Sequence, residues 1–487
     1  MALVASVPGS PYQPVLAPGA GPSGPFRALA GAVGLDALRG NVLVAAGVVA
    51  ILLAAGGFLL LLRESWRGNI SLRTIVLLAV VYHAVVLLLP LLFSRDVYSY
   101  AIQGRIAAVH GANPYVTTPA AFPGDPLYSL VGPKWLDTPS VYGPGFTLLA
   151  AGLAREIDDV PGLVVAFRVL AAAASLVTLA LVVGVVRRER PERAAFAAAL
   201  FGLNPVVLFQ SVGSGHNDLL VALAVAGAFA LVARGRTVAA AAALMLGALV
   251  KATAVLPLVL LVVWAVARAP VRERRRTLAL HAGTVAAIGL AVAAPFLQTK
   301  DPTLGMLELA KHEGWLAPSR FVGRALGGLA GWLGGNGAET IVAGLVRIGF
   351  AATLVGVLAL IARGVARRPY DPPVTAWGWS LVLLMLLGPV LLPWYVTWAL
   401  PVAWLLPRVP RLCLVVTGVA LSVSQFTAEL SRFPAAYDAN VLFGHYVLAP
   451  LLFGLLLWAV RDLRRRLRHG DLATEDAHNV AARAGGG

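Results

Sequence analysis

Long apolar stretches separated by short polar breaks recur along the chain from about residue 41 to residue 460. A helix that crosses a membrane needs roughly 20 apolar residues, within a range of about 17–25. By this criterion the pattern predicts an all-α, polytopic membrane protein with about 13 transmembrane helices. The predicted spans are 41–63, 74–93, 161–186, 194–212, 218–233, 237–250, 253–268, 278–297, 339–362, 375–392, 394–407, 412–428 and 441–460.

Several of these stretches are short, above all 237–250, 253–268 and 394–407. Short apolar segments interrupted by Gly or Pro tend to line cavities rather than to face lipid. The segment 142–154 is ambiguous, because its length fits a further span, a re-entrant segment or an interfacial helix. Residues 95–110 are expected to form a helix that lies along the membrane surface.

Composition places the chain firmly in the membrane class. It has 487 residues, of which 59% are hydrophobic and 13% charged, and its mean hydropathy is +0.81. Soluble domains do not have this balance. The formal net charge of +16 invites a nucleic-acid interpretation, but the distribution of the arginines argues against it.

The arginines collect in every second loop. With the N-terminus outside, the seven loops that face the cytoplasm in the thirteen-span arrangement hold 24 of the 39 Lys and Arg residues. Cytoplasmic loops of membrane proteins carry an excess of basic residues. The basic charge is therefore a topology signal, it places the C-terminus in the cytoplasm, and it argues that 142–154 does not cross the membrane.

The two ends of the chain differ from the apolar middle. Residues 1–40 are rich in Pro, Gly and Ala, lack the basic start and cleavage pattern of a signal peptide, and are predicted to be a disordered tail. Residues 41–462 form one transmembrane domain with large outer loops at 94–160 and 298–338. Residues 463–487 are predicted to be a basic and then flexible cytoplasmic tail. The single cysteine, Cys413, excludes an internal disulfide framework.

Unusual polar residues collect on the predicted outer side. They lie in "SRDVYSYAIQGRIAAVHGANPY" from Ser94, "SVYGPG" from Ser140, "GSGHNDLL" from Gly213, "LVKATAVLP" from Leu249, "KHEGWLAPSR" from Lys311 and "LPWYVTWALP" from Leu392. Polar residues at membrane depth are costly and usually functional. These segments are therefore expected to assemble one cavity that opens outward.

Each segment also has a purely structural interpretation. Asp96 fits a helix cap that pairs with Arg95 or Arg105, and Asn217 or Asp218 fits a cap of the following helix. Lys251 fits a side chain that reaches for the membrane surface. Trp394 fits the aromatic belt of a membrane interface.

Taken together, the segments fit a sugar attached to a lipid phosphate. Aromatic rings stack on sugar faces, and Lys or Arg binds phosphate. A carboxylate such as that of Asp96 takes the proton from an attacking hydroxyl.

Five of these segments, all except "KHEGWLAPSR", resemble in their order the bacterial polyprenol-phosphate-mannose-dependent α-1,6-mannosyltransferases of the glycosyltransferase C superfamily. The resemblance runs from roughly residue 40 to residue 460. It implies a multi-span fold with an active site on the outer, periplasmic face of the cell membrane. It also implies transfer of mannose from polyprenyl-phosphate-mannose to an α-1,6-mannan or glycolipid acceptor of the lipomannan type. No Gly-rich nucleotide loop is present, which agrees with a lipid-phosphate donor.

In this family an acidic residue of the first large outer loop is the usual catalytic base, and Asp96 holds that position. Many members carry a paired acidic motif there, whereas Arg95 and Val97 flank Asp96 in this chain. A metal-assisted mechanism is therefore not indicated, no cofactor is predicted, and the question of a divalent metal ion stays open. The fallback acids are Asp125, Asp137 and Asp218.

The resemblance also implies substrate contacts, and an inverting mechanism in which Asp96 acts as general base. The residues expected to bind sugars are Arg95, Tyr98, Tyr100, Gln103, Arg105, Asn113, Tyr115, Tyr142, His216, Asn217, Asp218, Trp394 and Tyr395. The residues expected to bind the lipid phosphate are Lys251, His312 and Arg320. The alternatives are a polyprenyl-phosphate transferase of another sugar and a transporter or flippase of lipid-linked sugars.

Overall fold

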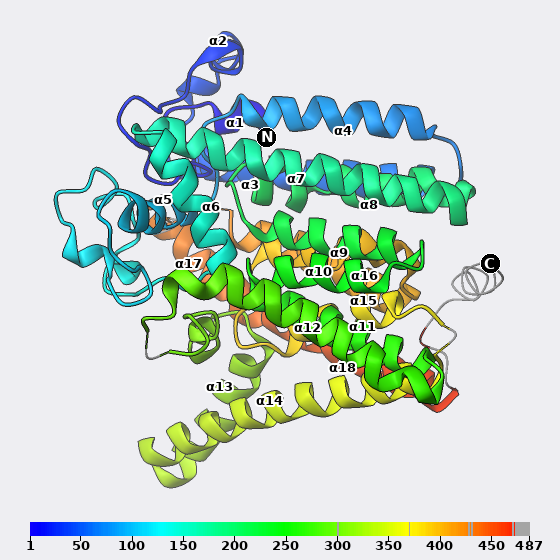
Figure 1. Cartoon of the computed structure of the whole chain (residues 1–487). Helices are drawn as coiled ribbons and strands as arrows, with labels where there is room; N and C mark the ends of the chain where they lie inside the picture. Colours follow the sequence, from blue (N-terminus) through cyan, green and yellow to red (C-terminus); the bar gives the residue numbers. More distant parts are fainter. Residues whose placement is uncertain (300, 370, 427–428, 430–431, 470–471, 473–487) are drawn as a thin grey trace.

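The computed structural model is built of helices that run mostly side by side (Figure 1), and it describes every residue except 300, 370, 427–428, 430–431, 470–471 and 473–487. No β-strand occurs among the described residues, so the expected all-α class is confirmed. The helices are α1 Ala2–Ala5, α2 Gly24–Ala32, α3 Gly40–Trp66, α4 Leu72–Leu87, α5 Asp96–Ala108, α6 Pro144–Glu156, α7 Val160–Glu189, α8 Ala194–Gly202, α9 Asp218–Val232, α10 Thr237–Ala248, α11 Val255–Arg268, α12 Arg274–Ala293, α13 Pro318–Gly334, α14 Asn336–Arg367, α15 Val374–Leu387, α16 Arg408–Ser424, α17 Pro434–Phe443 and α18 Ala449–His469.

All thirteen apolar stretches contain helical structure. Within the described residues, six helical segments are long and apolar enough to cross a membrane: Gly40–Trp66, Val160–Glu189, Pro191–Val212, Val271–Phe296, Gly337–Arg367 and Pro434–His469. The short stretch 394–407 consists of two 3-10 helices, Pro393–Trp398 (η10) and Leu400–Leu405 (η11). The chain is therefore a polytopic membrane protein, and the number of thirteen spans stays a prediction.

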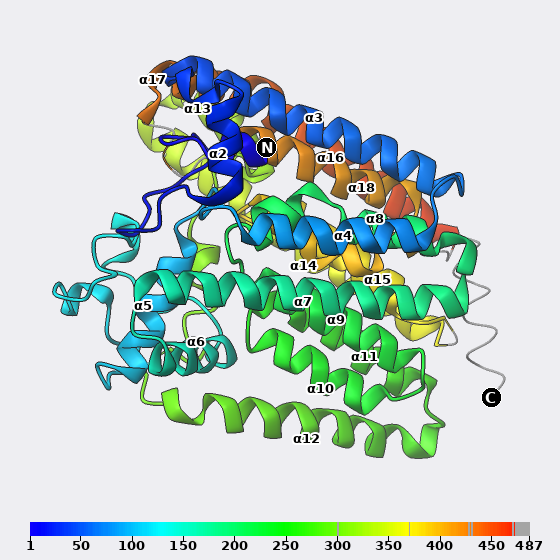
Figure 2. The ribbon, with the colours of Figure 1, turned by 90° about the horizontal axis from the view of Figure 1, so that it is seen from above.

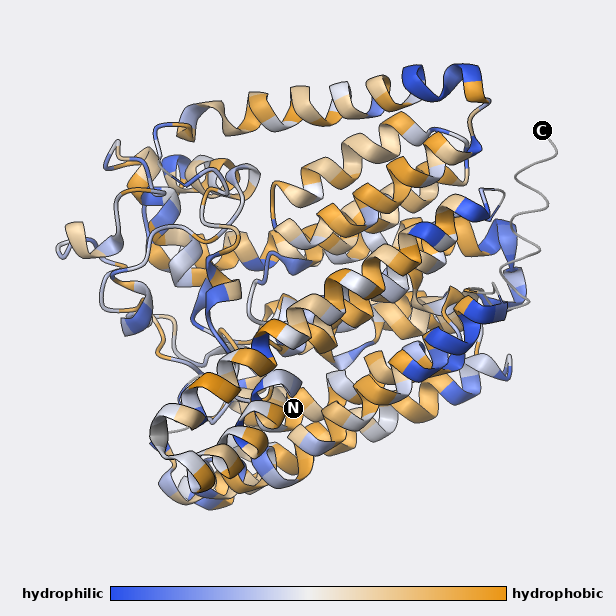
Figure 3. Ribbon diagram, turned by 90° about the horizontal axis from the view of Figure 1, so that it is seen from below, coloured by the Kyte–Doolittle hydropathy of each residue, from blue (hydrophilic) through white to orange (hydrophobic). Residues whose placement is uncertain are grey.

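Helices at the edge of the bundle present apolar side chains outward. On α14, Ile341, Ile348 and Val355 are each about two-thirds exposed, while Trp377 and Trp379 on the central α15 are fully buried. A helix that is apolar on its outer surface suits a hydrocarbon environment. The hydropathy view agrees, because hydrophobic residues fill the middle of the bundle and hydrophilic residues gather at its ends (Figure 3).

The basic loops meet at one end of the bundle. The guanidinium groups of Arg193 and Arg411 lie 3.6 Å and 5.0 Å from the ring centroid of Trp66. This contact joins the end of α3, the turn after α7 and the first turn of α16. Figures 1 and 2 show this end, where α3 and α7 finish, away from α5 and α6. The alternation of basic loops in the sequence therefore corresponds to a real polarity of the molecule.

The ambiguous segment 142–154 forms α6, which packs on α5 (Figure 2). Thirteen residues at about 1.5 Å per residue span roughly 20 Å, which is less than the roughly 30 Å of a hydrocarbon core. The two helices approach closely at Gly104, where an added Cβ would lie 2.4 Å from the Ala150 carbonyl oxygen. Thus α5 and α6 form a compact pair at the end of the bundle opposite the basic loops.

The N-terminal region differs from the predicted disordered tail. Val7 and Tyr12 are fully buried, and the Tyr12 hydroxyl donates to the Gly47 carbonyl at 2.5 Å. The Gln13 amide donates to the carbonyls of Ala5 and Val7. Composition suggested disorder because the segment is rich in Pro, Gly and Ala. The expectation is wrong because its few apolar side chains pack against α3 and the loop before α5.

Candidate functional site

A sharp turn after α4 sets the position of Asp96. Phe93 adopts a left-handed φ of 56°, a conformation that a bulky residue holds only when its surroundings enforce it. Its N–H donates to the Tyr12 carbonyl at 2.7 Å. Ser214 donates to the carbonyl of Leu92 at 2.6 Å. The turn is therefore fixed from both sides, by the N-terminal segment and by the loop that carries His216.

A buried arginine of α7 fixes the end of α4. The two terminal nitrogens of Arg168 donate to the carbonyls of Val86 and Leu89 at 2.6 Å and 2.8 Å. These carbonyls lie at the helix end, where no intrahelical donor is available. Arg168 thus joins α7 to the start of the turn that leads to Asp96.

Asp96 begins α5, and 31% of its side chain is exposed. Its backbone N–H donates to the Ser94 hydroxyl at 3.1 Å, and the positive end of the helix dipole favours a carboxylate at this position. Desolvation raises the pKa of Asp96 to about 6, against the opposing positive charge of Lys251. The carboxyl group therefore changes protonation state near neutral pH, as a general base should.

His216 lies beside the Asp96 carboxylate. Its Nδ1 lies 3.6 Å from the Asp96 Oδ2 and 3.2 Å from the Tyr100 hydroxyl. Its ring stacks on Trp394 with 3.7 Å between the ring centroids. Burial, assisted by the charge of Lys251, lowers the pKa of His216 well below its usual value. A neutral imidazole thus lies beside the carboxylate.

A buried ion pair lies near the Asp96–His216 pair. Asp218 accepts from the Lys251 ammonium at 2.8 Å and from the Trp398 indole N–H at 2.6 Å. The side chain of Asp218 is fully buried, and 14% of the Lys251 side chain is exposed. The ammonium also lies 4.9 Å from the ring centroid of Tyr395. Lys251 therefore neutralises a buried carboxylate and contributes positive potential near Asp96.

Two of the sequence motifs meet through their backbones. The N–H groups of Gly143 and Gly145 donate to the carbonyls of Val250 and Leu249 at 3.0 Å and 2.9 Å. A Cβ at position 143 would lie 2.1 Å from the Leu249 carbonyl oxygen, so this approach requires glycine. The motif "SVYGPG" thus positions Tyr142, whose ring meets that of Tyr100 edge to face at 4.8 Å.

A cavity of about 750 Å³ opens at Asp96, within the size range of small-molecule sites. Among the described residues that line it, Asp96 is the one carboxylate. Arg320 and Arg324, one turn apart on α13, belong to the same lining. The remaining lining residues include aromatic and polar side chains, among them Ser94, Arg95, Ser99, Trp135, Trp315, Trp394, Gln425, Tyr437, Asn440 and His445.

The structure brings part of the predicted set together. The residues of that set that line the cavity or surround Asp96 and its neighbours are Arg95, Tyr100, Tyr142, His216, Asp218, Lys251, Arg320, Trp394 and Tyr395. Asn217 and Gln103 are both buried, and each is close in sequence to a residue of this set. Three of their side-chain atoms have no hydrogen-bond partner within the described part of the chain. Arg95 forms an ion pair with Glu429.

Other predicted residues are held in contacts away from the cavity lining. Arg105 and His110 both bind the fully buried carboxylate of Asp125 at 2.8 Å. Asn113 accepts from the backbone N–H of Tyr115, whose hydroxyl donates to the carbonyl of Tyr142. His312 follows the 3-10 helix Glu308–Lys311 and does not line the cavity. Asp137, a fallback acid, is exposed and also outside the lining.

Sequence reasoning missed several residues of the cavity. Trp315 belongs to the motif "KHEGWLAPSR", which also contains the predicted phosphate-binding residue Arg320. Arg324 follows Arg320 one helical turn later. The i, i+4 spacing of the two arginines was a signal that could have found Arg324. His445, whose Nε2 lies 2.7 Å from an Arg324 nitrogen, comes from a distant segment and had no such signal.

Tyr98, predicted to bind sugar, has its hydroxyl bound to the N-terminal segment. It donates to the Val15 carbonyl and accepts from the Ala17 N–H, each at 3.1 Å. We expect Tyr98→Phe to lower the free energy of unfolding by about 1 kcal/mol through the lost hydrogen bonds, with the KM values for both substrates unchanged. Thermal unfolding in detergent and steady-state kinetics measure the two effects. A large rise in KM at unchanged stability would instead place the hydroxyl on substrate.

The described residues contain no group of three His, Cys, Asp or Glu side chains arranged as metal ligands. The polar chemistry of the site rests on single groups: a carboxylate with a raised pKa, a neutral histidine stacked on tryptophan, and two arginines in the cavity lining. Such a set can accept a proton, stack on a sugar and bind a phosphate.

Comparison with known proteins gives consistent matches. The family model described as "Alpha-(1->6)-mannopyranosyltransferase, N-terminal domain" matches residues 16–268, and the one described as "MptB C-terminal domain" matches residues 319–458. The chain is 30% identical to alpha-(1->6)-mannopyranosyltransferase A of Mycobacterium tuberculosis over 78% of this chain and 74% of the relative. It is 27% identical to alpha-(1->6)-mannopyranosyltransferase B of Corynebacterium glutamicum over 78% and 66%.

Proposed function

Because the chain belongs to the α-(1→6)-mannopyranosyltransferase family of the glycosyltransferase C type, we propose that it transfers mannose from polyprenyl-phosphate-mannose to an α-1,6-mannan acceptor on a lipomannan-type glycolipid. Asp96 acts as the general base, and the reaction proceeds with inversion. The observation that carries the proposal is the Asp96 carboxylate. It is partly exposed in a cavity of about 750 Å³, and its pKa is raised to about 6.

The choice of Asp96 over the fallback acids follows from their partners. Asp125 is bound by Arg105 and His110, and Asp218 is bound by Lys251 and Trp398. Both side chains are fully buried. A carboxylate that is already bound to a cation has little basicity left for a substrate hydroxyl. Asp96 combines access with a raised pKa.

A lipid-phosphate donor is favoured by other residues of the cavity lining. Arg320 and Arg324 supply two guanidinium groups, and Trp315 supplies an aromatic face. Guanidinium groups bind phosphate oxygens in a bidentate manner. Both arginines lie on α13, a helix whose Trp332 and Leu333 are strongly exposed apolar residues. A polyprenyl chain would therefore find apolar surface on the helix that holds its phosphate.

In the proposed step the Asp96 carboxylate takes the proton of the acceptor hydroxyl. The acceptor oxygen then forms a bond to the anomeric carbon as the bond from that carbon to the phosphate oxygen breaks. The electron pair of that bond stays on the polyprenyl phosphate, whose charge Arg320 and Arg324 stabilise. Attack from the face opposite the phosphate converts a β-linked donor into an α-linked product.

The proposed location is the cell membrane, with the cavity on the extracytoplasmic side and the C-terminus in the cytoplasm. This location is supported by the basic loops, which lie at the end of the bundle opposite α5 and α6. Basic loops remain in the cytoplasm during membrane insertion. A lipid-linked donor then suits the outer side, where nucleotide sugars are not available to the site.

The donor is tested with the purified protein in nanodiscs and a short α-1,6-mannoside acceptor. We expect radiolabel to pass from polyprenyl-phosphate-mannose to the acceptor, and none from a nucleotide-linked mannose. Polyprenyl phosphates that carry glucose or arabinose serve as matched donors. Preferred transfer from one of these would replace mannose as the donor sugar, and transfer from the nucleotide sugar would overturn the lipid-phosphate donor.

The pKa of Asp96 predicts the pH dependence of the reaction. Asp96 is a base only when it is deprotonated, and its pKa is about 6. We therefore expect kcat/KM to be constant well above pH 6 and to fall about tenfold per pH unit well below it. Burial lowers the pKa of His216 well below its usual value, so His216 takes up its proton at lower pH than an ordinary histidine does. A rate that stays level down to pH 4.5 would contradict the assignment.

A further inference from the structure

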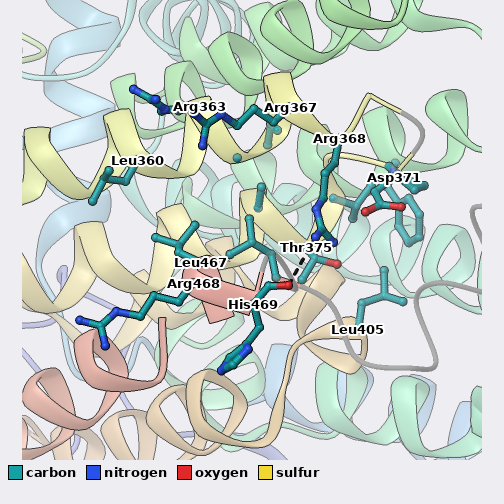
Figure 4. A pocket seen from close by; sticks show the side chains of 17 residues that line it. Leu360, Arg363, Arg367, Arg368, Asp371, Thr375, Leu405, Leu467, Arg468 and His469 are labelled. Atoms are coloured by element: carbon teal, nitrogen blue, oxygen red, sulfur yellow. Dashed lines mark hydrogen bonds between the residues drawn. The ribbon is translucent and has the colours of Figure 1, made fainter. Parts of the chain in front are cut away.

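A second cavity lies at the end of the bundle opposite Asp96, where α14 and α18 end. Its volume is about 520 Å³. Figure 4 shows Arg363 and Arg367 on α14, and Arg468 and His469 at the end of α18. Arg368 follows α14 and donates to the His469 carbonyl at 3.4 Å. We refer to this feature as the arginine cavity.

The charge of the arginine cavity is strongly positive. Among the described lining residues, four arginines stand against one acid, Asp371, which leaves a formal net charge of +3 with His469 neutral. Arg363, Arg367 and Arg468 are exposed, and no described side chain forms an ion pair with them. Guanidinium groups that line one cavity and have no ion-pair partner among the described side chains are available to bind phosphate oxygens.

The floor of the arginine cavity is apolar. Phe229, Val365, Val374 and Leu405 line it, and each is less than a tenth exposed. A basic rim over an apolar floor suits a ligand with an anionic head and a hydrocarbon chain. A soluble phosphate would gain nothing from the floor.

Topology alone does not account for this arrangement. Arginines that only keep a loop on one side of the membrane do not need to line a common cavity. Arg275 and Arg276 at the start of α12, for example, are exposed and do not line the arginine cavity. Here Arg363 and Arg367, one turn apart on α14, line the same cavity as Arg468 of another helix. We propose that the arginine cavity binds the phosphate headgroup of an anionic membrane lipid, with the first part of its acyl chain on the apolar floor.

The test measures lipid binding, so its outcome is independent of the proposed transfer activity. Purified full-length protein is delipidated, titrated with phosphatidylglycerol or phosphatidylcholine, and examined by native mass spectrometry. We expect one phosphatidylglycerol to bind with at least tenfold preference over phosphatidylcholine. Arg363→Gln/Arg367→Gln should weaken that binding about tenfold or more, because each basic residue near an anionic lipid contributes about 1 kcal/mol.

The matched control is Arg275→Gln/Arg276→Gln, which removes the same charge from the same end of the molecule and should bind as the wild type does. Arg468→Gln, on the other helix, provides a second variant if the first does not fold. Equal binding by all variants overturns the proposal. Displacement of the lipid by millimolar glycerol phosphate would show that a free phosphate ester, rather than a lipid, occupies the cavity.

Discussion

Asp96→Asn is expected to lower the rate of mannosyl transfer by about 10²–10⁴-fold, the usual contribution of a general base. The amide keeps the size and shape of the carboxylate but cannot take a proton from the acceptor hydroxyl. The hydrogen bond from the backbone N–H of residue 96 to the Ser94 hydroxyl does not involve the Asp96 side chain, and the amide oxygen of Asn can still accept from that hydroxyl as the carboxylate does. Folding should therefore be unaffected. Initial rates with radiolabelled donor, together with thermal unfolding in detergent, measure both effects.

Asp137→Asn is the matched control for this experiment. It removes a carboxylate of the same outer loop, but Asp137 is exposed and does not line the cavity. Its rate should equal that of the wild type. If Asp96→Asn retains a rate within tenfold of the wild type while folding normally, the base lies elsewhere. If only Asp137→Asn is inactive, the first outer loop is arranged differently during the reaction.

Lys251→Met is expected to have the largest effect on stability. It leaves the fully buried carboxylate of Asp218 without its cation, and breaking a buried pair in this way costs about 3–5 kcal/mol. Trp398 still donates to that carboxylate but cannot neutralise it. Thermal and chemical unfolding in detergent measure the loss. A variant as stable as the wild type would show that the Asp218–Lys251 pair is not essential to the fold.

The same variant should shift the pH profile. The positive charge of Lys251 lowers the pKa of Asp96, so its removal raises that pKa and moves the acid limb of kcat/KM to higher pH. Asp218→Asn/Lys251→Met serves as the control. It removes the unpaired charge and should recover most of the stability. The negative charge of Asp218 raises the pKa of Asp96. Removing this charge as well should therefore return the acid limb of kcat/KM toward that of the wild type.

Prediction from the sequence succeeded where the signal is local. A helix in a membrane satisfies its own backbone hydrogen bonds, so a run of apolar residues is sufficient to predict it. The thirteen stretches accordingly contain helices. The alternation of arginine-rich loops also depends only on position along the chain, and Trp66, Arg193 and Arg411 confirm that three of these loops meet.

Prediction failed where a contact joins distant segments. The N-terminal region lacks periodicity, so nothing local indicated that Tyr12 would be buried beside Phe93. No local signal indicated that the guanidinium of Arg105 would bind Asp125 at 2.8 Å. None indicated that the hydroxyl of Tyr98 would bind the backbone of Val15 and Ala17. In each case a polar group acquired a partner that its neighbours in sequence do not reveal.

The sequence by itself determined the helical class, the polarity of the loops and the motifs that form the site, because each depends on residues that are close together in the chain. Only the tertiary structure decided which acid is accessible. Asp96, Asp125 and Asp218 are chemically identical side chains, but Asp125 and Asp218 meet cations from other segments. Asp96 opens into a cavity with its pKa raised to about 6. Burial and charge around a carboxylate set its pKa, and both depend on segments that folding brings together.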